Sequence, residues 1–586
     1  MRPAPRARVG ALVGIFILLH SAGARDAVPA SGGRGADGVG RTGLAGKCAP
    51  ALLERLASPE APETLIVWIY FADRSCGGSA TAPRVPAAAR HRLSRTHAAR
   101  DERYLSPCAG YIDRIRPHLR RLRHVSSYFN AVSAVVSASE LPAICECPFV
   151  RGVEEVSVFR APLEPPGAEV DPPGARLRGR TAAHDYGGSY AQLDQIGVIP
   201  LLEKGYNGSG NVTGGEAVRI GVLDSGFRRD HEALSGVAVD AEWDFVQGDS
   251  VTSNQAGDPP TQDSHGTAVL GVIAGHAEGR LIGPAWGARY LLAKTEIINA
   301  SDEIVEEDNW VAGIEWADTN GADVVTSSLG YIDWYTQEDL DGRTAKCTIA
   351  ADIAAAHGIV VVNSTGNSGS LGLVAPADGF DVLAIGAVDR TGAIASFSSR
   401  GPTADGRTKP DFVALGVASY TVVPGDPDAY TTGNGTSYAA PLFAGACALL
   451  IEKQPGRDPV ELRGALRSSA SRSGSPDNAY GWGIPDFQLA AGCEAVPAAP
   501  AAFPNPFTER TMLRFYSATP ELVTARVYDC RGALVRTLLS GERRYCAWEL
   551  AWDGTRDVGG AAESGVYFAL VTRNSITTTF KLIRIR

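Results

Sequence analysis

The chain has 586 residues, of which 44% are apolar and 20% charged, close to the averages of globular proteins. At roughly 150 residues per domain, this length suggests about three or four folded units that can bury most of their apolar surface. A collagen-like or wholly disordered protein is therefore excluded. The formal net charge of −10 argues against a dedicated nucleic-acid-binding protein, because such proteins usually carry a basic surface.

Residues 1–24 are predicted to be a secretory signal peptide. Three arginines precede the short apolar run Gly10–Leu19, and the small residues Ala22, Gly23 and Ala24 follow it. A membrane anchor is the alternative, but about ten apolar residues are too few to cross a hydrocarbon core of ~30 Å. We therefore expect cleavage before Arg25 and a secreted or cell-surface protein.

Residues 25–160 have the composition of a mixed α and β domain. The strand-like run Thr64–Phe71 is followed by an arginine-rich stretch, Ala87–Arg123, which is predicted to be helical, and by the apolar part Ser127–Ile144. The arginines could form a nucleic-acid-binding patch, but a solvated helix face is the commoner arrangement and is preferred. Residues 161–183 contain five prolines and three arginines, which predicts an extended linker that proteases can reach.

Short β-branched runs alternate with Ala-rich helical runs through residues 184–493. The helical candidates include Asn309–Asp318 and Thr348–His357. Continuous apolar strands separated by helices indicate a parallel sheet covered on both faces, with functional groups at the carboxyl ends of its strands. The predicted strands are Val218–Leu223, Ala288–Lys294, Ala322–Ser327, Ile359–Asn363 and Val382–Val388.

The last part of the chain changes character again. Residues 494–506 form a second proline-rich linker. In residues 507–586, short alternating strands at Met512–Tyr516, Thr524–Tyr528 and Val566–Thr572 are separated by Gly and Asp turns, which predicts a small β-sandwich.

The ten cysteines are compatible with disulfides in an exported protein. Spacing does not reveal their connectivity, although Cys530 and Cys546 lie in adjacent predicted strands and are the favoured pair. Cys145 and Cys147 could suggest a metal site, but no second such motif accompanies them, so a structural role is favoured. Cys447 lies in an apolar run and is expected to be a buried, unreactive residue.

Three separated segments of residues 184–493 each offer one member of a nucleophilic triad. Asp224 ends a predicted buried strand, where a carboxylate can be held rigidly to orient an imidazole. His265 opens the apolar helix 268–274, and Ser437 lies at the beginning of another apolar helix, where the helix dipole favours a developing oxyanion. The chain order Asp, His, Ser is informative because unrelated serine hydrolases use different orders.

At these residues the chain resembles the catalytic domain of subtilisin-like serine proteases (subtilases) over roughly residues 190–490. The matching motifs, all in the family's order, are Val222–Gly226, Ser264–Val269, Ser327–Gly330, Gly366–Gly369, Gly435–Ser437, Ser396–Pro402, Lys409–Asp411 and Tyr480–Gly483. The resemblance implies a three-layer αβα domain with a central parallel sheet at residues 184–493. It also implies a serine endopeptidase that works through an acyl-enzyme intermediate.

Carried over onto matching positions, the resemblance assigns roles to individual residues. Ser437 would be the nucleophile, His265 the general base and acid, and Asp224 the orienting carboxylate. Asn367 would donate its side-chain amide to the oxyanion, together with the backbone N–H of Ser437. The segment Ser328, Leu329 and Gly330, with Gly366, would bind the extended backbone of a polypeptide substrate.

Three features near the site depart from the family pattern or leave its reading open. Tyr438 follows the nucleophile where many members have Met, which removes an easily oxidised sulfur. The segment Gly275–Gly287 lacks the Asn-rich loop that holds calcium in some relatives. No cofactor is therefore expected to be required, and a structural Ca²⁺, though possible through other carboxylates, has no clear motif. The acidic residues between Glu296 and Asp308 either favour basic substrate side chains or form a solvated loop, the second being preferred.

The flanking parts also resemble known domains. Residues 25–160 resemble the α+β propeptide of subtilases, which implies a zymogen cut within 161–183 and an intramolecular inhibitor. Residues 507–586 resemble the Ig-like β-sandwich at the ends of many secreted bacterial proteins, including type IX secretion sorting domains, and imply secretion machinery as a partner. Two rival functions remain: a catalytically idle module that serves adhesion or anchoring, and a hydrolase of esters or non-protein amides.

Overall fold

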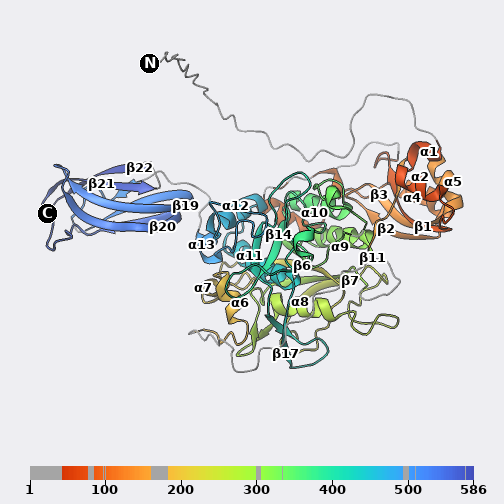
Figure 1. Cartoon of the computed structure of the whole chain (residues 1–586), viewed down its shortest axis with the longest axis horizontal. Coiled ribbons are helices and arrows are strands. Elements are labelled where there is room, and N and C mark those ends of the chain that lie inside the picture. The colour runs from red at the N-terminus through yellow and green to blue at the C-terminus, as the bar shows by residue number, and fades with distance from the viewer. Residues whose placement is uncertain are drawn as a thin grey trace, which may run out of the picture.

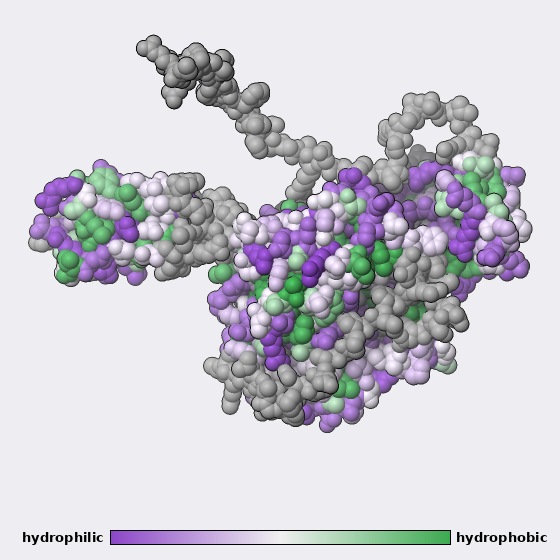
Figure 2. Space-filling view, viewed as in Figure 1, coloured by the Kyte–Doolittle hydropathy of each residue, from purple (hydrophilic) through white to green (hydrophobic). Residues whose placement is uncertain are grey.

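The computed structural model describes residues 43–76, 85–96, 98, 101–159, 183–297, 305–332, 334–492, 501–508, 510–573 and 576–585. They form an N-terminal domain (43–159), a central domain (183–492) and a C-terminal β domain (501–585), coloured red to blue in Figure 1. The predicted signal peptide and nearly all of the linker 161–183 lie outside the described residues. On the visible face of the central domain, hydrophilic and hydrophobic residues are interspersed (Figure 2).

The N-terminal domain is a four-stranded sheet in the order β2-β3-β1-β4 with helices packed against it. Strand β1 spans Thr64–Phe71, as predicted. The expected helical stretch Ala87–Arg123 is wrong as one unit, because it contains two helices, short 3-10 turns and the start of a strand. The other elements are α1 Leu44–Lys47, α2 Pro50–Ala57, α3 Ala87–Thr96, α4 Ala109–Ile115, β2 Arg121–Ser126, β3 Ala131–Ser137, α5 Leu141–Glu146, β4 Val150–Glu155 and β5 Val158–Phe159.

The central domain is built on a seven-stranded sheet in the order β15-β14-β13-β12-β6-β10-β7, in which every pairing is parallel. All five predicted strands are present within two residues at either end, and β7 and β15 are additional. The strands are β6 Arg219–Asp224, β7 Ala238–Asp244, β10 Arg289–Lys294, β12 Val324–Ser327, β13 Val360–Ser364, β14 Leu383–Val388 and β15 Phe412–Leu415.

Helices cover both faces of this sheet, so the predicted three-layer α/β fold is confirmed. Neighbouring residues of one strand show this directly: Val324 belongs to the core cluster under α8 and α11, and Val325 to the cluster under α9 and α10. The principal helices are α8 Ser264–Ala274, α9 Glu307–Thr319, α10 Lys346–Ala356, α11 Thr436–Lys453 and α12 Pro459–Ser469. The smaller elements are α6 Tyr190–Gln195, α7 Ile199–Leu202, β8 His276–Ala277, β9 Leu281–Ile282, β11 Val305–Glu306, β16 Ser419–Val422, β17 Tyr430–Gly433 and α13 Phe487–Gly492.

The N-terminal domain packs on the layer formed by α9 and α10. Trp68 and Tyr128 of the N-terminal domain lie in the same buried cluster as Trp310 and Ile314 of α9. Because these side chains are removed from water only while the two domains are in contact, the hydrophobic effect favours the contact.

The C-terminal β domain has five strands in one hydrogen-bonded sheet among its described residues. The separately predicted strands Met512–Tyr516 and Thr524–Tyr528 are parts of one long strand, β19. The strands are β18 Ala501–Phe503, β19 Thr511–Asp529, β20 Leu534–Trp552, β21 Gly565–Arg573 and β22 Ile576–Arg584. A separate core that includes Trp552 and Leu513 lies beneath them.

The cysteines differ from expectation. A disulfide joins Cys76 and Cys108 of the N-terminal domain. The favoured Cys530–Cys546 pair is wrong: Cys530 is a free thiol in the turn after β19, whereas Cys546 pairs with Ser517 far along the β19–β20 ladder. Cys447 is buried, as expected.

No helix among the described residues combines the length and the apolar character that crossing a membrane requires.

Candidate active site

Asp224 and His265 form a direct hydrogen bond at the carboxyl edge of the central sheet. Asp224 is the last residue of β6 and is completely buried, and its Oδ1 lies 2.6 Å from Nδ1 of His265. The same oxygen accepts a hydrogen bond from the Ser225 N–H at 2.8 Å. Since a carboxylate accepts, the imidazole donates from Nδ1, and Nε2 is left as the basic ring nitrogen.

A glycine makes this pairing possible. Gly266 follows His265 in α8, and a Cβ at this position would lie 2.2 Å from the carbonyl oxygen of Gly226 and 3.0 Å from Oδ1 of Asp224. Only a residue without a side chain lets the first turn of α8 approach the end of β6 so closely.

The loop that leads into α8 is held by a buried lysine. Lys294 ends β10, and its ammonium lies 2.8 Å from carboxylate oxygens of both Asp244 and Asp258. The buried charge is thereby paired on two sides, as burial requires. Gln262 adds a second link, because its Nε2 donates to the carbonyl of Ser225 at 2.6 Å. Sequence reasoning missed Lys294 and Gln262, since neither belongs to a motif and their partners are distant in sequence.

Ser437 is the second residue of α11, a helix that packs against α8. Its hydroxyl donates to the carbonyl of Ser328 at 3.4 Å, and the Ser328 hydroxyl donates to the carbonyl of Ser437 at 2.8 Å. The predicted nucleophile and the predicted substrate-binding segment are thus joined in both directions.

Asn367 lies close to Ser437 with its amide in a fixed orientation. Its Oδ1 accepts hydrogen bonds from both the backbone N–H and the hydroxyl of Thr436, each at 3.0 Å. A Cβ built on Gly435 would lie 3.6 Å from Nδ2 of Asn367 and 3.6 Å from the backbone nitrogen of Ser437. The two predicted oxyanion donors therefore flank one point in space. Thr436, which sequence reasoning did not assign, orients the amide.

Two of the remaining predicted site residues, Gly330 and Gly366, lie against Val374. A Cβ on Gly330 would lie 2.2 Å from one methyl of Val374, and a Cβ on Gly366 would lie 2.9 Å from the other. The carbonyl of Leu329, in the same segment, accepts a hydrogen bond from Asn363 Nδ2 at 3.1 Å. The segment that follows β12 is thus fixed beside the loop that carries Gly366.

The acidic stretch between Glu296 and Asp308 is described only in part. Burial raises the pKa of Glu307, although its carboxylate accepts hydrogen bonds from Tyr335 and from the Cys347 N–H. The preferred interpretation as a solvated loop is therefore wrong for Glu307. Residues 298–304 lie outside the described part of the chain.

A segment of the N-terminal domain forms a separate two-stranded sheet with the central domain. Strand β5, its last described element, pairs antiparallel with β11, which directly precedes α9. Because α9 connects the carboxyl end of β10 to the amino end of β12, its first turn and β11 lie at the carboxyl edge. Within the described ranges, no three His, Cys, Asp or Glu side chains are arranged to hold a metal ion.

Comparison with known proteins places these motifs in a family context. The sequence profile of the subtilase family matches residues 215–483. The chain is 34% identical to subtilisin DY of Bacillus licheniformis over 305 residues, which cover 50% of this chain and 97% of that protein. It is 33% identical to subtilisin E of Bacillus subtilis over 330 residues (55% and 76%), and 32% identical to subtilisin Savinase of Lederbergia lenta over 279 residues (47% and 91%).

Proposed function

The chain belongs to the subtilase family and is a subtilisin-like serine endopeptidase, and on that premise we propose that Asp224, His265 and Ser437 are its catalytic triad. The observation that carries the assignment is the 2.6 Å hydrogen bond between buried Asp224 and His265. The links between Ser437 and the Ser328 segment support it, because they put the nucleophile beside the segment proposed to hold the substrate.

In the proposed reaction, Ser437 Oγ attacks the carbonyl carbon of the scissile peptide while His265 Nε2 takes its proton. Asp224 holds the imidazole in position and stabilises the imidazolium that forms. The oxyanion of the tetrahedral intermediate accepts hydrogen bonds from Asn367 Nδ2 and the Ser437 N–H. His265 then protonates the leaving amine, and water releases the acyl group from Ser437. This chemistry needs no cofactor, and a structural Ca²⁺ is not part of the proposal.

We also propose that the substrate is an extended polypeptide that lies beside Ser328, Leu329, Gly330 and Gly366. Backbone recognition of this kind suits many sequences, with side-chain pockets adding preference. The pairing of β5 with β11 supports the proposal, because here a segment of the chain itself binds as an added strand.

The N-terminal domain is proposed to be a propeptide and intramolecular inhibitor, removed by cleavage within 161–183. Its packing on α9 and α10 and the approach of β5 to the carboxyl edge support this role. The proposal includes export directed by residues 1–24. It also includes attachment or sorting through the C-terminal β domain, with secretion machinery as the partner.

Hydrolysis of unfolded casein tests the function directly. Processed wild-type protein is expected to cleave casein, and Ser437→Ala to lower kcat by about 10⁶, the loss known for subtilisin. Ser235→Ala, an exposed serine outside the site, serves as the control. An active wild type with an equally active Ser437→Ala variant would reject the triad. Hydrolysis of small esters without cleavage of casein would favour the esterase alternative.

A further inference from the structure

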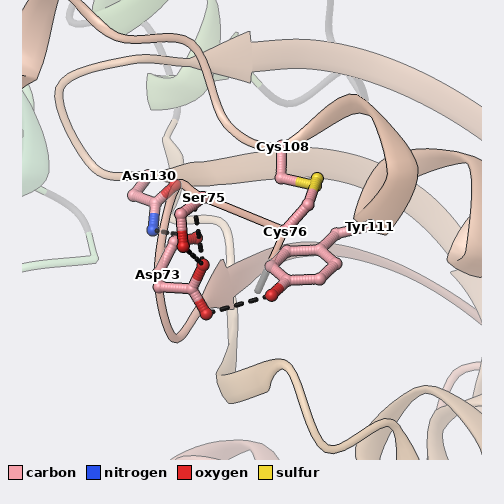
Figure 3. The surroundings of a disulfide bond; sticks show 6 residues. All are labelled: Asp73, Ser75, Cys76, Cys108, Tyr111 and Asn130. Carbon is pink, nitrogen blue, oxygen red and sulfur yellow. Dashed lines mark hydrogen bonds between the residues drawn. A yellow bond between two sulfur atoms is a disulfide. The ribbon is translucent and has the colours of Figure 1, made fainter. Parts of the chain in front are cut away.

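An insertion of the N-terminal domain reaches the opposite edge of the central sheet. We call residues 85–105 the clamp; its described parts include α3 and a 3-10 turn at Glu102–Tyr104. Cys76 precedes the clamp in the sequence and Cys108 follows it, and a disulfide joins these two cysteines, with a Cα–Cα distance of 5.6 Å (Figure 3). Beside the disulfide, Tyr111 donates a hydrogen bond to Asp73 at 3.0 Å, as Figure 3 shows.

Arg92 of the clamp is buried in the central domain, with 1% of its surface exposed. Its Nε donates to the carbonyl of His357 at 3.1 Å, and one terminal nitrogen donates to the carbonyl of Ala322 at 2.5 Å. The other terminal nitrogen forms a salt bridge with the fully buried Asp318. The central domain thus provides one carboxylate and two carbonyls, a set of acceptors that suits a planar guanidinium.

Aromatic side chains of the N-terminal domain complete this site. The hydroxyls of Tyr104 and Tyr128 donate to Asp318 at 3.0 Å and 2.6 Å. The ring of Tyr104 stacks on His357 with the ring centres 4.3 Å apart. His357 itself bonds Asp318 through Nδ1 at 2.7 Å, so each buried polar group has a partner.

The position of this site separates it from the catalytic centre. Ala322 and His357 precede β12 and β13, so they lie at the amino edge of the sheet, whereas Asp224 and β11 lie at the carboxyl edge. The backbone of α3 is also close here: a Cβ on Gly321 would lie 2.6 Å from the carbonyl oxygen of Ala88. The N-terminal domain therefore contacts the central domain at both the carboxyl and the amino ends of the parallel strands.

We propose that Asp318, Ala322 and His357 form a guanidinium-binding docking site that retains the N-terminal domain through Arg92 after the linker has been cut. The proposal rests on the proposed function only in assuming that the linker is cut. The N-terminal domain has two contacts with the central domain, and while one is formed it keeps the other at a high effective concentration. Cutting the linker leaves the clamp in place, and release requires the guanidinium to leave a buried carboxylate.

The test separates retention from catalysis. The full chain carries Ser437→Ala and, within residues 161–182, a recognition sequence for an added site-specific protease. After cutting, the dissociation of the N-terminal domain is followed by size exclusion and by fluorescence of a dye on that domain. Removing one partner of a buried ion pair leaves the other uncompensated, so Arg92→Ala should speed dissociation at least about 100-fold.

Arg90→Ala is the matched control, because Arg90 lies in the same helix, is exposed and donates to Val85 of the clamp itself. Its dissociation rate should equal that of the unsubstituted cut chain. If Arg92→Ala behaves like this control, the proposal is overturned. Because the nucleophile is absent and the cut is made by an added enzyme, this result does not depend on the proposed catalytic activity.

A second variant keeps the proposal testable if Arg92→Ala fails to fold. Tyr104→Phe retains the ring that stacks on His357 and removes only the hydroxyl, which donates to Asp318 and accepts from Arg92 at 3.3 Å. Losing a hydrogen bond to a buried charge should speed dissociation about tenfold. An unchanged rate in a folded Tyr104→Phe protein, checked by its unfolding transition, would also overturn the proposal.

Discussion

Gly435 combines two features that only glycine can provide at the start of α11. Its φ of +154° is rarely adopted by other residues, and a methyl group there would enter the space between Asn367 Nδ2 and the Ser437 N–H. That space is where we propose that the oxyanion of the tetrahedral intermediate is bound. The identity of this single residue therefore matters to the reaction as well as to the backbone.

Gly435→Ala is predicted to lower kcat at least about tenfold, because the methyl group displaces the oxyanion from its donors, and removing the side-chain donor alone costs about 2.7–4 kcal/mol in subtilisin. The measurement is peptide hydrolysis by the processed enzyme, with kcat and KM determined separately. Gly456→Ala is the control, since a Cβ at Gly456 meets nothing within 4 Å. An unchanged kcat in Gly435→Ala would contradict the proposed position of the oxyanion.

Helix α9 runs from the carboxyl end of the parallel strands to their amino end and carries buried acidic residues that face the N-terminal domain. Glu315 accepts hydrogen bonds from Ser126 and from the Ser127 N–H of that domain. Burial raises the pKa of Glu315 to about 7 despite these bonds. At the C-cap of α10, burial opposes the protonation of His357, but hydrogen bonds to Asp101 and to Asp318 of α9 outweigh it and raise its pKa.

The raised pKa of Glu315, and the part of the His357 shift that comes from Asp101 of the N-terminal domain, predict that binding of the N-terminal domain weakens as the pH rises. A group whose pKa is higher in the complex than in the free domain takes up a proton when the domains bind. It therefore stabilises the complex at low pH, and this stabilisation is lost as the pH rises past the raised pKa. Glu315 therefore weakens binding progressively between its ordinary pKa of 4.5 and about pH 7. His357 weakens binding further above its ordinary pKa of 6.5. Asp101 and Asp318 have lowered pKa values, so they act in the opposite direction only below pH 3.8.

The charged and titratable groups that face His357 are Arg92, Asp101, Tyr104, Tyr128 and Asp318.

The dissociation constant of the cut Ser437→Ala chain is therefore expected to rise severalfold between about pH 6.5 and pH 8, above the range in which His124, whose pKa burial against α9 lowers, acts in the opposite direction. Glu315→Gln should flatten this dependence, because an amide cannot ionise. A dissociation constant that stays constant or falls over this range would contradict the interpretation of α9 and His357.

Across the whole molecule, the sequence predicts those features that depend on residues close together in the chain. The buried parallel strands were predicted because each is a continuous apolar run. Strand β7 was missed because it alternates polar and apolar residues and is partly exposed; the short strand β15, Phe412–Leu415, was also missed. Both are the outermost strands of the seven-stranded sheet.

Long-range partners explain the other differences. The arginines of residues 87–123 were interpreted as a solvated face, yet Arg92 is buried and the side chains of Arg95 and Arg123 are only 8% and 7% exposed. Their carboxylate partners lie more than a hundred residues away, in α9 and at Asp323. A sequence pattern shows that charges lie on one side of a helix, but not that another domain covers them.

The most direct test of the central claim is to map the adduct that a fluorophosphonate forms with the processed enzyme. The serine oxygen displaces fluoride from phosphorus, so the bond reports which hydroxyl is activated. The account predicts one adduct, on Ser437, formed far more slowly in His265→Ala and not at all in Ser437→Ala. An adduct on another residue, or none in a preparation that cleaves casein, would contradict it.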